Sequence, residues 1–257
     1  MNTPKQLIPF IWAYTLIGLF SLVALDLNWL YVCGFFFLFA LGNGTVGHRY
    51  FSHNSFKVAK PLHWILALWT TITGYSPIVY WIVQHRHHHA HTDQPEDVHS
   101  PRNGLLQAIF LWTVNKDRID SVFKDPNSMY NYVRAMRDPA IRFFSTYHLY
   151  INLIFLLVLY IIDPSLLMAA SAAYVLEQVR LAILNTVHHT PGIPLNYVNH
   201  SLKDSSQNNY VLGILTLGFG WHNNHHKNAK KLILTEKWWE IDLEGYVGWM
   251  LSKTSKQ

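Results

Sequence analysis

The architecture is decided by Leu7–Val46, which reads LIPFIWAYTLIGLFSLVAL, then a single Asp26, then LNWLYVCGFFFLFALGNGTV. Each apolar run is nineteen or twenty residues long and contains no charged side chain. A helix needs about 20 mostly apolar residues to cross a bilayer. We therefore predict two membrane-spanning helices, at residues 7–25 and 27–46, joined by a tight turn.

A second pair of apolar runs, residues 143–162 and 166–187, is joined by Asp163-Pro164-Ser165. Proline ends helices, so this pair predicts a second hairpin. Residues 62–83 are also apolar, but the sequence Gly-Tyr-Ser-Pro at 74–77 interrupts them. We interpret that run as a re-entrant or surface-lying segment and predict four spans in total.

The composition agrees with a membrane-embedded chain that forms one domain over residues 1–257. Charged residues make up 14% of the sequence, against about 25% in soluble domains, and half of the residues are hydrophobic. The single cysteine, Cys33, excludes an internal disulfide framework, a cysteine zinc site and an iron–sulfur cluster. The basic pI near 9.2 fits loops that contact anionic lipid or an acidic partner, and we expect no nucleic-acid binding.

Basic residues predict the orientation of the spans. The turns between paired spans contain no Lys or Arg, whereas residues 47–142 contain eleven and residues 188–257 contain seven. Lys and Arg accumulate on the cytoplasmic side of membrane proteins. We therefore expect a multi-pass integral membrane protein whose two termini, and a cap formed by residues 47–142 and 188–257, lie in the cytoplasm.

Sixteen histidines are the second anomaly, and fifteen of them lie in the two long polar segments or where these meet a span. The pattern H-x-x-H-H occurs twice, at 85–89 and 222–226, and residues i, i+3 and i+4 of a helix share one face. Each pattern should therefore direct three imidazoles into one volume. His48 and His53 are about 140° apart on an ideal helix, so they require a helix end or a distortion.

Asn185 and His189 are i and i+4, also on one helix face, which brings the candidate imidazoles to nine. Imidazole binds iron, copper, zinc or nickel, and nine rings suit two ions rather than one. No carboxylate lies inside these motifs, which disfavours a carboxylate-bridged di-iron bundle. His87 should point away from the other rings. We interpret the remaining histidines as surface residues, satisfied polar residues or supporting groups: His63, His91, His99, His148, His188 and His200.

These motifs resemble those of the membrane fatty acid desaturases, most closely the stearoyl/acyl-CoA delta-9 type and its bacterial and cyanobacterial relatives. The resemblance runs in order from about residue 7 to about residue 250. It is carried by Gly47–His53, His85–His89, Asn185–His189, Asp204–Asn209 and Gly220–His226.

The resemblance implies an all-α protein with four transmembrane helices in two hairpins, a cytoplasmic helical cap and a di-iron centre beside a bent acyl tunnel. It also implies that Asn185 reaches one iron through a water molecule. The nine implied iron ligands are His48, His53, His85, His88, His89, His189, His222, His225 and His226.

Four residues at three places in the sequence depart from the family pattern. Val98 follows Asp97 where the family commonly has proline, and Phe219 lies between two glycines where it commonly has glutamate. Val83-Gln84 occupies the place of the Arg-Asp pair of the animal acyl-CoA enzymes. These changes concern the carrier of the acyl chain and the outcome of the reaction rather than the metal ligands.

Several groups should support the metal centre. Asp97 and Asp204 are our candidates to accept hydrogen bonds from ligand rings, with Asp93 a weaker one.

Glu177 and Arg180, three residues apart inside the fourth span, should form a structural ion pair. The aromatic segment 64–81 is equally compatible with a tunnel wall and with an interfacial aromatic belt.

The predicted activity is O2-dependent insertion of a double bond, at delta-9 by resemblance, into an acyl chain carried by CoA, acyl carrier protein or a lipid. Two iron ions would carry the hard chemistry, and electrons would come from a separate ferredoxin or cytochrome b5-like protein. Docking of this donor and contact with lipid headgroups are equally compatible with the cytoplasmic cations Arg86, Arg102, Lys116, Lys227, Lys230 and Lys231.

Two other functions remain open. A membrane di-iron hydroxylase or alkane monooxygenase shares such histidine motifs but inserts oxygen, so its product is an alcohol. A zinc or iron transporter is more remote, because transporters place their ligands near the middle of the bilayer. Here the only histidine inside a predicted span is His148.

Overall fold

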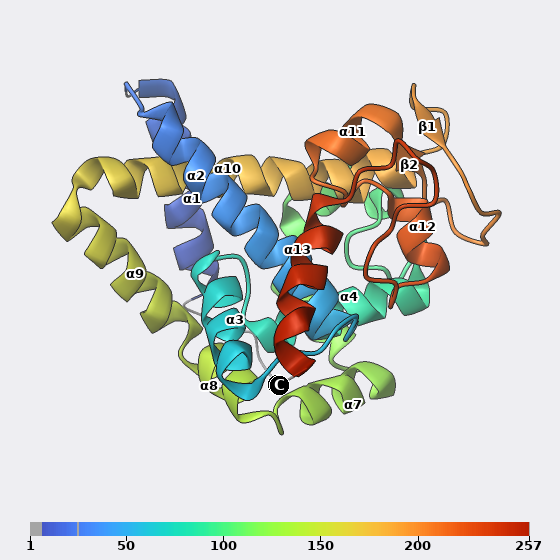
Figure 1. Cartoon of the computed structure of the whole chain (residues 1–257), viewed down its shortest axis with the longest axis horizontal. Coiled ribbons are helices and arrows are strands. Elements are labelled where there is room, and N and C mark those ends of the chain that lie inside the picture. The colour runs from blue at the N-terminus through green and yellow to red at the C-terminus, as the bar shows by residue number, and fades with distance from the viewer. Residues whose placement is uncertain (1–6, 25, 257) are drawn as a thin grey trace.

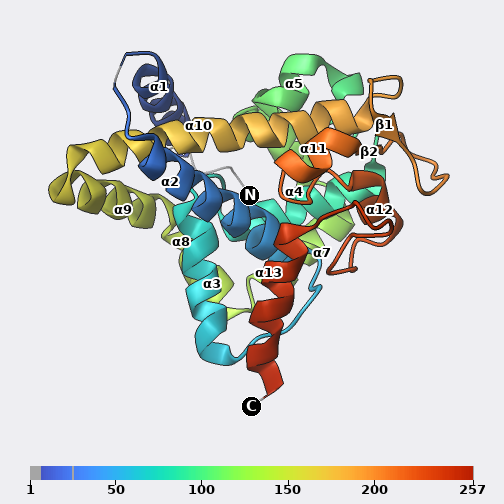
Figure 2. The same cartoon turned by 45° about the horizontal axis from the view of Figure 1, so that its top comes forward.

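The computed structural model describes residues 7–24 and 26–256, and these residues form a predominantly helical molecule (Figures 1 and 2). The one named β-sheet among the described residues is two-stranded and antiparallel, pairing Asn196 with Asn209 and Tyr197 with Asn208. In chain order the elements are α1 (Leu7–Ala24), α2 (Trp29–Leu41), η1 (Gly42–Ser52), α3 (Lys60–Ile72), α4 (Ile78–His91), η2 (Pro101–Asn103), α5 (Leu105–Ile109), η3 (Leu111–Thr113), α6 (Lys116–Val122), α7 (Pro126–Ala135), α8 (Pro139–Thr146), α9 (His148–Ile162), α10 (Pro164–Thr186), η4 (Val187–His189), β1 (Asn196–Tyr197), β2 (Asn208–Asn209), α11 (Tyr210–Leu215), α12 (His222–Lys227), α13 (Leu243–Ser252) and η5 (Lys253–Lys256).

Helix α10 is the central helix of the apolar part, and α1, α2 and α9 pack against it (Figure 1). Small residues allow close packing at this centre, where Ala169–Ala173 are buried. The ring of Tyr14 on α1 stacks on that of Tyr174, with centroids 4.1 Å apart. The hairpins expected from the sequence therefore meet through one shared helix rather than as two separate units.

Two of the helices in the described residues are long and apolar enough to cross a membrane: Trp29–Ser52, which joins α2 to η1, and Pro164–His189. The expected third span, residues 143–162, falls on a bent pair of helices that together are long and apolar enough for one broken span or a re-entrant segment. Residues 143–146 belong to α8, which meets α9 at a 67° bend. Helix α1 is apolar but shorter.

Large apolar side chains cover the outer faces of these helices. Val23 on α1, Leu30 on α2 and Ile161 on α9 are each more than two-thirds exposed. Exposed apolar surface of this extent marks a contact with lipid or with another protein. A hydrocarbon environment would satisfy it, because helices bond their backbone groups internally.

The segment 62–83 forms two helices, α3 and α4, rather than one. The break falls at Gly74, whose φ of +76° disfavours other residue types, and at Pro77, which begins the next helix. The indole of Trp69 donates to the carbonyl of Leu38 on α2, 2.8 Å away, so α3 is tied to a predicted span. Trp64 on the same helix remains 43% exposed.

The histidine motifs lie where helices end. Helix α4 and the joined helices α2–η1 and α10–η4 each carry histidines in their last turns, and the short α12 carries the fourth motif. Helix α13 packs against η1 and brings the C-terminal tail to the same region (Figure 2).

Candidate metal centre

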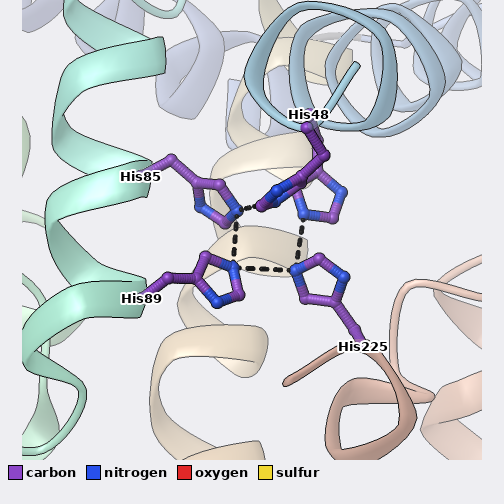
Figure 3. A group of neighbouring side chains, drawn as sticks. His48, His85, His89 and His225 are labelled. Atoms are coloured by element: carbon purple, nitrogen blue, oxygen red, sulfur yellow. Dashed lines mark hydrogen bonds between the residues drawn. The ribbon is translucent and has the colours of Figure 1, made fainter. Parts of the chain in front are cut away.

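Five imidazoles from three parts of the chain converge on one point. His48 and His53 come from the end of η1, His85 and His89 from α4, and His225 from α12; Figure 3 shows four of these rings facing one another. Consecutive contacts join the Nε2 atoms in the order His53, His85, His89, His225 and His48. The first distance is 2.7 Å, and the other three are 2.9–3.0 Å.

A second cluster of four imidazoles adjoins the first and contains His88, His189, His222 and His226. The Nε2 atom of His222 lies 2.9 Å from that of His189 and 3.1 Å from that of His226. The ring centroids of His89 and His226, one from each cluster, are 4.6 Å apart. All nine histidines named from the sequence therefore lie in two neighbouring clusters.

Each H-x-x-H-H motif supplies both clusters, which differs from the single volume expected from the sequence. His85 and His89 join the first cluster, whereas His88 joins the second. At 100° per residue, position i+4 lies about 40° from i, while i+3 lies about 60° away on the other side. In motif 222–226 positions i and i+4 again stay together, but the two clusters are exchanged: His222 and His226 lie in the second cluster and His225 in the first.

The distortion that His48 and His53 require is a π-helical segment. The amide of His53 donates to the carbonyl of His48, five residues earlier, and the Ser52 hydroxyl donates to the carbonyl of Gly47. Bonds from i to i+5 widen the helix, and such segments occur often at functional sites. The two imidazole centroids are consequently only 4.8 Å apart.

The two clusters fit a pair of metal ions. Two nitrogens bound at right angles to one ion, each about 2.1 Å from it, would be about 3.0 Å apart. The nitrogen separations in both clusters are close to this value. The Nε2 atom of His88 is buried and has no hydrogen-bond partner among the described residues.

Burial favours the neutral imidazole, the form that binds metal, in both clusters. Burial, with Arg86 as the second cause, lowers the pKa of His53 to about 3. Burial also lowers the pKa of His226 to about 4, although the hydrogen bond with Asp204 acts in the opposite direction. Lone pairs are therefore available in both clusters at neutral pH.

Carboxylates contact the outer nitrogens of three rings in the second cluster. Asp97 accepts from His88 Nδ1 at 2.8 Å, and Asp204 accepts from His226 Nδ1 at 3.3 Å. Asp93, ranked lowest from the sequence, lies 3.4 Å from His189 Nδ1. Burial opposes ionisation of Asp97, but the interaction with His88, including the hydrogen bond, outweighs it and lowers the pKa of this carboxyl. Each contact directs the opposite ring nitrogen toward the cluster.

Buried amides hold α12, which at six residues is too short to be stable alone. The side-chain Oδ1 atom of Asn208 accepts from the backbone amides of Asn223 and Asn224, at 2.9 and 3.3 Å. The Asn224 side chain in turn donates to Glu240 in the tail. The two asparagines inside H-N-N-H-H thus anchor the helix to the loop and the tail while its histidines face the clusters.

Asn185, expected to reach an ion through water, is buried near the end of α10, and its side-chain amide donates to the carbonyl of Ala108 at 3.0 Å. The expectation that His87 points away is confirmed, because its ring contacts Ser128 and the carbonyl of Glu96. His99, left open between a supporting group and a surface residue, is buried, and its ring lies 4.1 Å from that of His88. The available signal was its position two residues after Asp97.

The expected ion pair between Glu177 and Arg180 is confirmed, with 2.7 Å between Arg180 Nε and Glu177 Oε2. Sequence reasoning missed the rest of the network. Arg180 also binds Glu244 of α13 at 2.8 Å, and Arg49 binds Asp242 at 2.7 Å. Two arginines and three carboxylates, all buried, therefore link the fourth predicted span and η1 to the C-terminal tail.

Phe219, which departs from the family pattern, packs directly on the centre. Its ring centroid lies 4.5 Å from that of His48, and the Arg180 guanidinium lies 5.1 Å from the same phenyl centroid. Val83 and Gln84, the other departure, are both buried. Gln84 lines a narrow cavity together with Tyr75 and Trp112.

The model of the fatty acid desaturase family matches residues 27–231. Hex-5-enoyl-[acyl-carrier protein] acetylenase of Moorena producens is 31% identical over 91% of this chain and 79% of its own length. The sn-2 palmitoyl-lipid 9-desaturase of Nostoc is 30% identical over 78% and 71%. Icosanoyl-CoA 5-desaturase of Limnanthes douglasii is 28% identical over 82% of this chain, which spans 60% of that relative.

These relatives share the activity class but act on different acyl carriers and positions, as their names state. The family match covers most of the chain and includes all four histidine motifs. The chain belongs to the fatty acid desaturase family and is an oxidoreductase that acts on fatty acyl chains.

Proposed function

We propose that this protein uses O2 and a di-iron centre to convert one CH2–CH2 pair of an acyl chain into a double bond. The net reaction consumes O2, two electrons and two protons and releases two waters. The observation that carries the proposal is the pair of adjoining clusters, with five and four imidazoles. When bound, the iron pair would supply the oxidising power that no side-chain acid or base provides.

The chain's own residues would hold the iron and position the acyl chain. The nine clustered histidines would be the ligands, with Asn185 reaching one ion through water and Asp97 and Asp204 orienting their rings. The rings of Trp81 and His85 are parallel, with centroids 5.9 Å apart, and Trp112 and Tyr75 lie within 6.0 Å of Trp81. This aromatic wall would exclude water and hold the acyl chain beside the centre, each buried CH2 contributing about 0.8 kcal/mol.

We also propose the position of the double bond, the number and orientation of the spans, and the electron donor. The Nostoc relative and the motif resemblance support reaction at delta-9, although other relatives are named for position 5. The exposed apolar faces of α1, α2 and α9 support four spans in a bilayer, and the basic loops support a cytoplasmic centre and termini. A separate ferredoxin or cytochrome b5-like protein would supply the electrons.

Expression in a host of defined lipid composition tests the activity. We expect new monounsaturated fatty acids, a double bond at one position by mass spectrometry, and two iron ions per purified chain. An alcohol in place of the alkene would identify a hydroxylase. A triple bond would match the Moorena relative, whose name specifies an acetylenase.

A further inference from the structure

A hollow that lies outside the metal centre is lined by basic residues. It has a volume of about 640 Å³, and its lining includes Lys57, Arg134 and Lys230. All three cations are exposed, and none forms an ion pair with a described residue. We call this hollow, defined by these three residues, the basic pocket.

The single carboxylate of the basic pocket, Asp138, is already engaged. It accepts from the backbone amides of Ala140 and Ile141 at the start of α8, and it lies 3.1 Å from His63 Nε2. His63 Nδ1 is in turn 2.9 Å from the hydroxyl of Tyr50. The wall is therefore held by hydrogen bonds, and the field in the pocket remains positive.

Two residues that line the basic pocket are close in sequence to a histidine of the first cluster. Phe51 and Asn54 line the pocket and flank His53 in the sequence, with Ser52 between. His53 Nε2 lies 2.7 Å from His85 Nε2 inside the cluster. Arg86, adjacent to His85, donates to the carbonyl of Ser52 and adds a further positive charge.

We propose that the basic pocket docks an acidic electron-carrier protein, which passes electrons to the first cluster by way of His53. This inference rests on the proposed function, because desaturation needs two external electrons for each double bond. Each docking event would oxidise the carrier by one electron and reduce the iron pair by one. Complementary charge would speed the encounter and fix its orientation.

The structure selects among the cations considered from the sequence. Lys231 is paired with Glu236, Lys116 with Asp120, and Arg102 bonds the hydroxyl of Ser205. Lys230 forms no ion pair with a described residue and lines the pocket. Lys57 and Arg134 line it too, although sequence reasoning did not single them out.

Charge reversal in the purified, iron-loaded protein tests the docking surface. The probe is a reduced, acidic [2Fe–2S] ferredoxin, with Lys57→Glu and Lys230→Glu alone and together. The matched control is Lys124→Glu, an exposed lysine outside the pocket lining. We expect the double variant to raise the apparent KM for ferredoxin about tenfold at low salt, and the control to leave it unchanged. The wild-type rate should fall with ionic strength, and the variant should lose this dependence.

Three further measurements keep the outcome unambiguous. Iron content, the KM for the acyl substrate, and product formed in a single turnover after chemical reduction with dithionite should match the wild type. An unchanged ferredoxin KM would refute the proposal. So would an effect confined to the acyl substrate or to binding of anionic lipid vesicles.

The docking proposal and the proposed function fail separately. If dithionite-reduced wild type forms no double bond, the function is wrong, whatever ferredoxin does. If it forms one and the pocket variants still respond normally to ferredoxin, only the docking surface is wrong. Direct titration with oxidised ferredoxin measures docking independently of turnover.

Discussion

At the scale of single residues, adjacent histidines on α4 have opposite environments. His88 directs an unpartnered nitrogen at the second cluster while Asp97 holds its other nitrogen. His87 turns the other way and bonds Ser128. The helical rotation of 100° between neighbours separates a proposed ligand from a packing residue with the same side chain.

This contrast predicts different consequences for the same substitution. His88→Ala should abolish the new double bond and reduce the iron content, because the second cluster loses one of four imidazoles. His87→Ala should keep both iron ions and measurable activity, at some cost in stability. Iron analysis and fatty acid profiles of the two variants check this. Product from His88→Ala at the wild-type level would contradict the site assignment.

Asp97 should influence the metal centre by orienting His88, and its carboxylate also accepts from the backbone amides of Asp93 and His99. Asp97→Asn weakens the hydrogen bond that orients this ring, and loss of such a partner typically costs 10–100-fold in metal affinity or activity. Iron release to a chelator measures the affinity. Asp138→Asn, at a carboxylate that contacts His63 outside the clusters, is the control and should release iron at the wild-type rate. Equal rates in all three proteins would argue against the orienting role.

At the scale of elements, packing on α10 depends on small residues. A Cβ atom added at Gly18 of α1 would lie 2.2 Å from the backbone carbonyl oxygen of Ser171. Backbone cannot rotate away as a side chain can, so α1 would have to shift. Gly34 on α2, in contrast, has no atom within 4 Å of such a Cβ position.

Gly18→Ala should therefore destabilise the protein by about 1–3 kcal/mol, the usual range for overpacking. Gly34→Ala should be neutral or stabilising by up to about 1 kcal/mol, because alanine favours helix more than glycine does. Thermal unfolding in detergent micelles compares the two variants. A lower melting temperature for Gly34→Ala than for Gly18→Ala would show that the α1–α10 contact is looser than described.

At the scale of the whole molecule, the buried charge network joins the predicted membrane part to the C-terminal tail. It contains one more carboxylate than arginines: Glu177, Asp242 and Glu244 against Arg49 and Arg180. One oxygen of Glu244 has no hydrogen-bond partner among the described residues. Burial raises the pKa of Glu244 to about 7, so this residue holds the excess proton near neutral pH.

The sign of the resulting pH dependence follows from linkage. Between the ordinary pKa of 4.5 and about 7, the folded state holds a proton at Glu244 that the unfolded state has released. Stability should therefore fall as pH rises from about 4.5 to about 7, by roughly 3 kcal/mol from this group. Glu244→Gln should flatten this part of the stability–pH curve, measured by denaturant unfolding. Glu236→Gln, at a partly exposed carboxylate, should not, and an unaltered slope in Glu244→Gln would contradict the assignment.

Much of this organisation could be predicted from local sequence. Apolar run length placed α1, α2 and α10 within a few residues, and motif spacing named all nine clustered histidines. The bend at Tyr147 was missed because the hydropathy of residues 143–162 is continuous, whereas α8 turns to pack on α3. The tail partners of Arg49 and Arg180, Asp242 and Glu244, were missed because they are remote in sequence.

The sequence by itself determined the helical apolar architecture, the family and the identity of the clustered histidines, because these depend on composition and on spacing within single helices. The division of the nine imidazoles into one cluster of five and one of four became known only from the tertiary structure. That division depends on the π-helical segment at His48–His53 and on the rotation of α12 against α4. The bonds of the π-helical segment are local, but contacts between distant segments bring η1, α4 and α12 together, and no pattern within one helix encodes those contacts.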